Sequence, residues 1–195
     1  MTQLARKFTE QTTVEAFMDL PGNERRELVD GIVTLMAPSR PIHGRLQARL
    51  TILIGQHLDR GKGPCWVATE PGVQPRAQAS VNVRIPDLGV SCTPERADDR
   101  FMREPVLLVE ILSPSNGKDT SSNIMAYASI PSVAEVLIID STRRAIEHLA
   151  RLPDGSWPEN PLAIGEDDAF TLPSIGLTLT MAEVYAGTSL AEGRS

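Results

Sequence analysis

Residues 105–112 read PVLLVEIL, and residues 134–140 read AEVLIID. Both runs are almost entirely aliphatic, which is typical of strands that are covered on both faces. Between them the sequence SPSN (113–116) predicts a turn, and a helix is expected over about residues 120–129. Strand, helix and strand over this distance predict a right-handed crossover unit, which joins two parallel neighbours in one sheet.

The rest of the chain adds antiparallel signals to this unit. Residues 25–38 read RRELVDGIVTLMAP, in which Asp30-Gly31 lies between two apolar arms and predicts a hairpin. Apolar residues between Leu46 and Leu58 are spaced four, three, one and four apart, which predicts a helix from His43 to about residue 60. Hairpins combined with one crossover predict an α/β (α+β mixed) fold with a central mixed sheet. Other predicted elements are a short helix at 14–20 and strands within 65–75 and 80–92.

The length and composition predict one folded domain, residues 1–195, and we expect its termini to be short and flexible. Apolar residues make up 41% of the chain and charged residues 23%, which is typical of globular proteins. No apolar run approaches the roughly 18 residues that span a bilayer, so no membrane partner is expected. The N-terminal segment has no apolar stretch typical of a secretory signal, and we therefore expect a cytoplasmic protein.

Cys65 and Cys92 lie far apart in the sequence, with no CxxC or Cys/His spacing around them. A zinc site lacks its ligands, and a disulfide is not expected in the cytoplasm. We therefore expect two small, buried, reduced side chains.

The formal net charge of −6 argues against a general binder of polyanions, because phosphate contacts need local lysine and arginine. An enzyme that gathers carboxylates around a metal is nevertheless acidic at that site, and it can carry basic residues on the rim. The candidates for such a rim are Arg40, Arg45 and Arg49, or Arg143 and Arg144. For each of them a solvated surface position is the alternative.

Two carboxylates stand out by their surroundings. Asp87 follows Pro86 where a strand is predicted, and Glu110 lies inside the aliphatic run VLLVEIL. An ionised carboxylate among aliphatic groups costs several kcal/mol unless a salt bridge to an arginine, protonation or a divalent cation compensates it. Mg²⁺ prefers one or two carboxylates, a carbonyl and waters. Asp87, Glu110 and the carbonyl of Ile111 supply such a set if the two strands are neighbours.

Five motifs occur in a recognisable order: ELVDG (27–31), a histidine opening a helix, PDLGV (86–90), VEILSPSN (109–116) and AYASIPSVAEVLIID (126–140). In this order the chain resembles the Uma-two family, a domain of unknown function (number 820) in the PD-(D/E)XK nuclease superfamily. The resemblance covers about residues 12–185. It implies a restriction-endonuclease-like core, in which a central mixed sheet is flanked by helices and the carboxylates lie at one end.

The resemblance also implies site residues and a function. Asp87 matches the aspartate of the PD element, and Glu110 matches the acidic residue of (D/E)XK. Glu27 and His43 match positions that line the same cavity, although a solvated residue beside a hairpin and a plain helix start are the alternatives. The implied protein is a DNA endonuclease that depends on Mg²⁺ or Mn²⁺ and works as a homodimer, with DNA as its partner.

The sequence departs from the superfamily pattern at the catalytic lysine, which usually lies two residues after the glutamate. That position is Leu112 here. Members of the Uma-two family commonly place the lysine on the following helix, at a position that corresponds to Asn123, four residues before Tyr127. Lys118 is a possible substitute, with a solvated loop residue as the alternative.

Asparagine can orient a water molecule but adds no charge. The second hypothesis is therefore a catalytically impaired nuclease fold, which acts as a nucleic-acid-binding or interaction module. A third hypothesis is a metal-dependent hydrolase of a small substrate.

Overall fold

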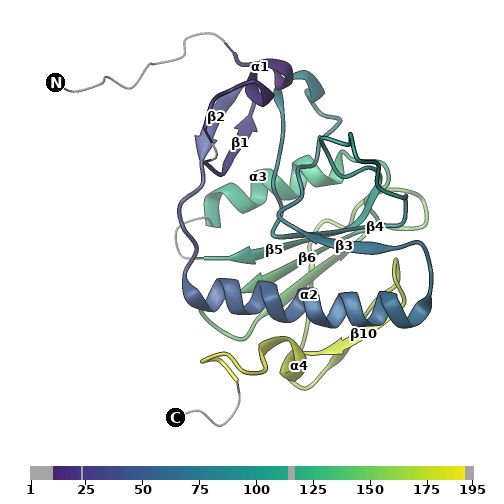
Figure 1. Ribbon diagram of the computed structural model, residues 1–195. Helices are drawn as coiled ribbons and strands as arrows, with labels where there is room; N and C mark the ends of the chain where they lie inside the picture. The colour runs from purple at the N-terminus through teal and green to yellow at the C-terminus, as the bar shows by residue number, and fades with distance from the viewer. Residues whose placement is uncertain (1–10, 23, 114–116, 192–195) are drawn as a thin grey trace, which may run out of the picture.

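The computed structural model describes residues 11–22, 24–113 and 117–191, with side chains in the third helix described from Ser122 onward. A six-stranded sheet in the order β3-β4-β5-β6-β7-β8 forms the centre of the molecule (Figure 1). β5 and β6 are parallel and the other neighbours are antiparallel, which confirms the predicted mixed sheet and the crossover between these strands. The strands of this sheet are β3 (Trp66–Thr69), β4 (Leu88–Ser91), β5 (Pro105–Leu112), β6 (Glu135–Asp140), β7 (Ile146–Ala150) and β8 (Leu162–Ala163).

Two hairpins and several helices surround the sheet. The hairpins pair β1 (Arg26–Val29) with β2 (Ile32–Leu35), and β9 (Ala169–Leu172) with β10 (Leu177–Thr180). The helices are α1 (Val14–Met18), α2 (Pro41–Gly61), α3 (Gly117–Ala128) and α4 (Met181–Tyr185), and a 3-10 turn (η1) covers Ala79–Val81. In the described part of the chain, no helix has the length and apolar character needed to cross a membrane.

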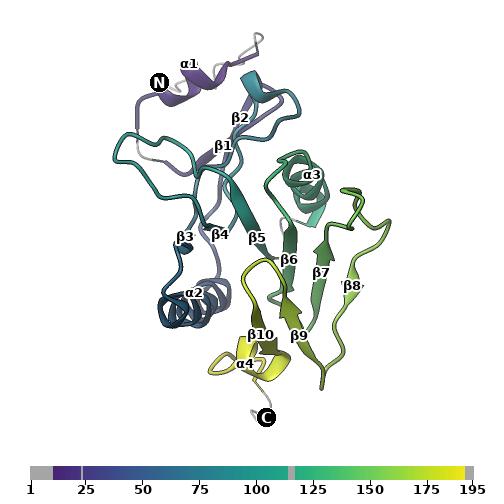
Figure 2. The same ribbon diagram turned by 90° about the vertical axis from the view of Figure 1, so that its right-hand side faces the viewer.

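β5 is covered on both faces, as its aliphatic sequence predicts. Leu107, Val109 and Ile111 pack in the cluster that contains the apolar side of α2, whereas Leu108 packs in the cluster that contains Tyr127 of α3. Figure 2 shows α2 and α3 on opposite sides of the sheet. Because side chains alternate along a strand, Glu110 projects on the same face as Leu108, toward α3.

The first hairpin forms where Asp30-Gly31 predicts it. Both residues have positive φ, 50° and 81°, which is the backbone of the two-residue hairpin turn. The next segment leads into α2, which begins at Pro41, two residues before the predicted start. Proline at the first helical position is favourable because its fixed φ suits the helix and no N–H is needed there.

Residues 80–86 differ from the predicted alternating strand. The segment starts in the 3-10 turn and then makes isolated bridges, from Val83 to Leu28 and from Arg84 to Val73. It links the first hairpin to the central sheet, and regular pairing in β4 begins only after Pro86, which has no N–H to donate. The segment thus delivers Asp87 to the start of β4.

The expectation of two reduced cysteines is wrong, because Cys65 and Cys92 form a disulfide. Their neighbours Trp66 and Ser91 are partners in the register of β3 and β4, so the cysteines face each other one step beyond this pair. Both cysteine side chains are half-buried. The proximity comes from strand pairing and not from a local sequence motif.

Candidate functional site

A cavity of about 360 Å³ lies where β4 begins and β5 ends. One wall is the segment 34–40, which connects the first hairpin to α2. The opposite side is formed by Asp87, Glu110 and Asn123, and Glu27 and His43 also line the cavity. The structure therefore brings together five of the residues that the sequence nominated, from β1, α2, the position just before β4, β5 and α3.

The Asp87 carboxylate is buried and held from two sides. Its Oδ1 lies 2.8 Å from Nε2 of His43, and its Oδ2 accepts a hydrogen bond of 2.7 Å from the backbone N–H of Ile111. The Gln47 side chain also donates to the backbone carbonyl of Asp87, at 3.0 Å. Contacts from α2 and β5 thus fix the orientation of this carboxylate.

The Glu110 carboxylate is 6% exposed and faces α3. Its Oε1 accepts hydrogen bonds from the Tyr127 hydroxyl and, at 3.3 Å, from the Asn123 side-chain amide. Burial raises the pKa of Glu110 to about 8, with a further upward effect from the Asp87 charge, although the hydrogen bond from Tyr127 opposes it. The same burial and the Glu110 charge raise the pKa of Tyr127 well above its ordinary value, so the phenol stays protonated and donates.

Replacing Glu110 by a side chain that cannot ionise should stabilise the metal-free protein at neutral pH. The carboxyl has an ordinary pKa of 4.5 and a folded-state pKa of about 8, so its ionisation favours unfolding. The stability it contributes is fully present below about pH 4.5 and is lost as the pH rises through about 8. We expect Glu110→Gln to gain stability over wild type across this range, by an amount on the order of a few kcal/mol.

The measurement is thermal unfolding of both proteins in EDTA between pH 5 and 9. Taking the difference between them removes the effects of the other titrating groups. A difference that does not change with pH would contradict the assigned environment of Glu110.

Glu27 and His43 are buried, 8% and 6% exposed, so Glu27 is not the solvated residue beside a hairpin that was its alternative. The Glu27 Oε1 accepts a hydrogen bond of 2.7 Å from the backbone N–H of Ile85, and its negative charge adds to the upward shift in the pKa of Glu110. His43 contacts Asp87 through Nε2, as given above. Both residues therefore belong to the cavity.

The other nominated residues have different placements. The carbonyls of Val106 and Leu112 accept hydrogen bonds on the β6 side, from Ala134 and Ser141. Because carbonyl directions alternate along a strand, the Ile111 carbonyl turns to the β4 side, where Asp87 lies. Lys118 is within α3, but its side chain is outside the described residues. The Leu112 side chain, at the usual lysine position, packs against the apolar cluster on the α3 face.

Tyr127 is a residue at this site that the sequence reasoning did not nominate. The available signal was its spacing of four residues from Asn123, which places both side chains on one helical face. The structure shows that both donate to the same oxygen of Glu110.

The donor set fits a hard divalent cation. Among the described residues there is no cluster of three or more His, Cys, Asp or Glu side chains that could hold a metal. Two buried carboxylates beside a carbonyl suit Mg²⁺ or Mn²⁺, which keep several waters. Among the described side chains no arginine pairs with Glu110, whose pKa is raised by burial and by the Asp87 charge.

The basic residues proposed for the rim separate into two groups. Of the five, Arg40 lines the cavity. Arg45 and Arg49 donate instead to backbone carbonyls at and after α4. Arg143 and Arg144 pair with carboxylates outside the cavity.

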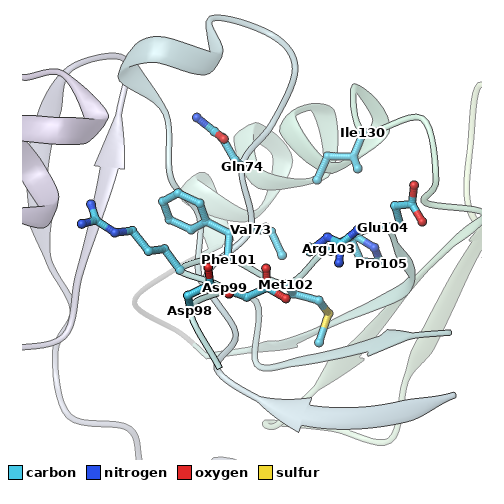
Figure 3. Close-up of a pocket in the computed structure, with 11 residues that line it drawn as sticks. Val73, Gln74, Asp98, Asp99, Phe101, Met102, Arg103, Glu104, Pro105 and Ile130 are labelled. Carbon is cyan, nitrogen blue, oxygen red and sulfur yellow. The ribbon is translucent and has the colours of Figure 1, made fainter. Parts of the chain in front are cut away.

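A second cavity, of about 350 Å³, lies against the loop 98–105 (Figure 3). Phe101 and Met102 contribute apolar surface, and the acidic residues Asp98, Asp99 and Glu104 on its rim are exposed. Exposed carboxylates are hydrated already and gain little from a bound ion. The buried carboxylates of the first cavity make it the better candidate.

Comparison with known proteins identifies the family of this chain. The Uma2 family model, described as "Putative restriction endonuclease", matches residues 14–182. The chain belongs to the Uma2 family. This confirms the resemblance found in the sequence.

Two similar proteins extend the comparison. A protein of Synechocystis sp. (strain ATCC 27184 / PCC 6803 / Kazusa), "Uncharacterized protein slr1290", is 30% identical over 166 residues, covering 84% of this chain and 85% of that protein. A crystal structure from Anabaena variabilis ATCC 29413, described as "a putative nuclease belonging to DUF820", superposes with a TM-score of 0.72 at 16% identity. It covers 89% of this chain and 97% of that one. This second match shows the shared fold, and fold and family together indicate a restriction-endonuclease-like nuclease.

Proposed function

We propose that this Uma2 protein is a DNA endonuclease that depends on Mg²⁺ or Mn²⁺ and acts as a homodimer. The observation that carries the proposal is the buried pair of Asp87 and Glu110 in one cavity, with the pKa of Glu110 raised to about 8. Two acids that interact while buried are costly for a metal-free protein, and perturbed carboxylates in a cavity are typical of functional sites.

The residues of the cavity have separable roles in this proposal. Asp87, Glu110 and the Ile111 carbonyl would hold the cation. When bound, it would activate a water molecule and neutralise charge that develops on the phosphodiester. His43 keeps Asp87 in position, and Tyr127 fixes one oxygen of Glu110 while leaving the other for a ligand.

Asn123 is the residue that separates this proposal from its alternative. Its amide donates to Glu110 and can orient a water, but it supplies no positive charge. This favours the second function, a catalytically impaired nuclease fold that binds nucleic acid or a protein partner. The intact acidic pair favours the enzyme.

The experiment is incubation of supercoiled plasmid with the purified protein in Mn²⁺, Mg²⁺, Ca²⁺ or EDTA. We expect nicked plasmid with Mn²⁺ or Mg²⁺, and none with EDTA. DNA binding without cleavage in every metal would support the module instead. If the protein neither binds nor cleaves DNA, both functions are contradicted, and hydrolysis of a small substrate is favoured.

A further inference from the structure

The cavity is acidic, and its substrate under the proposed function is an anion. Glu27, Asp87 and Glu110 all line it and all are buried. A phosphodiester that approaches this cavity is repelled unless a cation at the mouth offsets the carboxylates. The bound metal contributes part of this charge, and the lysine expected of the superfamily is absent at Leu112 and Asn123.

Two arginines line the same cavity, and they differ in their partners. Arg25 forms an ion pair of 2.7 Å with Glu70, so its charge is offset by that carboxylate. Arg40 is exposed, and its guanidinium has no hydrogen bond or ion pair within the part of the chain that the structure describes. His43, the third basic side chain there, is held by Asp87.

The position of Arg40 also suits anion binding. It is the N-cap residue of the 21-residue helix α2, and its side chain makes no capping bond. The positive end of the helix dipole therefore adds to the charge of the guanidinium. The planar guanidinium can donate two parallel hydrogen bonds to phosphate oxygens.

We infer that Arg40 binds a backbone phosphate of the nucleic-acid substrate at the mouth of the cavity and holds the phosphodiester against the acidic pair. This inference rests on the proposed function. Arg40 is a positioning residue in it, because its charge acts on the approach of the phosphate and not on the attacking water. One phosphate contact is expected to appear both in affinity and in its dependence on salt.

The test is DNA binding measured by fluorescence anisotropy, using a labelled duplex in Ca²⁺ over a series of salt concentrations. Arg40→Ala should weaken binding about tenfold and make the negative slope of log affinity against log salt less steep by about one. Arg40→Lys should keep that slope, because the charge remains, with a smaller loss of affinity. Under cleavage conditions in Mn²⁺, Arg40→Ala should raise KM more than it lowers kcat.

The matched control is Arg60→Ala. Arg60 is an exposed arginine on the same helix, roughly 30 Å away along the helix axis. Its removal changes the net charge equally and should leave the salt slope unchanged. Equal losses in the two variants would show a general charge effect and overturn the inference.

The inference and the proposed function fail in different ways. A wild-type protein that neither binds nor cleaves DNA overturns both. A wild-type protein that cleaves DNA, with an Arg40→Ala variant that keeps affinity and salt slope, overturns the role of Arg40 alone.

Discussion

Replacing Asp87 by asparagine is expected to lower the rate of metal-dependent DNA cleavage at least about a thousandfold. Asparagine keeps the volume of the side chain and can still accept a hydrogen bond from the Ile111 N–H. It removes one of the two negative charges that would hold the cation, and metal stabilisation of transition-state charge is worth several kcal/mol. Plasmid nicking in Mn²⁺ measures the loss of cleavage rate, and calorimetric titration with Mn²⁺ measures the loss of metal affinity.

Glu110→Gln should cause a comparable loss, and the double variant should be no slower than either single variant. Two ligands of one ion act as a unit, so once the first is removed, removing the second lowers the cleavage rate little further. The control is Asp140→Asn, since Asp140 ends the neighbouring strand β6 but pairs with Thr142 and Arg143 outside the cavity. Additive losses from Asp87 and Glu110, or an equal loss from Asp140, would contradict a shared metal.

The same Glu110→Gln variant should be inactive and yet more stable than wild type without metal. Its gain follows from the raised pKa of Glu110, because burial and the Asp87 charge disfavour the ionised form. A residue that destabilises the folded chain while it enables the reaction is typical of a functional site. The opposite result, a loss of stability, would indicate that Glu110 serves mainly to support the fold through Tyr127.

The elements with strong local signals could be predicted from the sequence. The aliphatic runs of β5 and β6 are continuous, the apolar stripe of α2 follows the helical period, and Asp30-Gly31 determines its turn by backbone conformation. The irregular link at 80–86 was missed because its alternation imitates a strand, whereas its partners, Leu28 and Val73, lie on two different parts of the chain.

The disulfide could not be predicted for a similar reason. Cys65 and Cys92 are 27 residues apart, and only the pairing of β3 with β4 brings them together. Their half-buried position next to the sheet carries no sequence signal. Reasoning from compartment alone led to the wrong expectation.

The acidic pair could be predicted because an ionisable residue in an aliphatic strand is an energetic anomaly. The sequence also indicated residues around the acidic pair, but it could not give the contacts between them. The bond from His43 to Asp87 spans 44 residues, and the bond from Ile111 to Asp87 depends on the register of β4 and β5. Tyr127 was overlooked because a buried tyrosine on a helix is usually part of the core.

Replacing Asn123 by lysine is expected to raise the rate of cleavage about a hundredfold. One positioned donor or charge that stabilises a transition state is worth roughly that factor or more. The Asn123 amide lies 3.3 Å from Oε1 of Glu110 and lines the cavity, so a longer side chain has room to reach the substrate side. The ammonium would also lower the pKa of Glu110, which favours the ionised form that binds a metal.

The control for this gain is Ser122→Lys, which adds the same charge one residue earlier on α3. Ser122 is exposed, and successive residues on a helix point about 100° apart, so its lysine faces solvent. A plasmid-nicking rate that rises in Asn123→Lys and not in Ser122→Lys would show that the acidic site is competent and lacks only a positioned cation. If both variants cut no faster than wild type, the missing lysine is not what limits the reaction. A wild-type protein that is inactive and stays inactive with Asn123→Lys would favour the binding module over the enzyme, because an intact metal site given its charge should cleave.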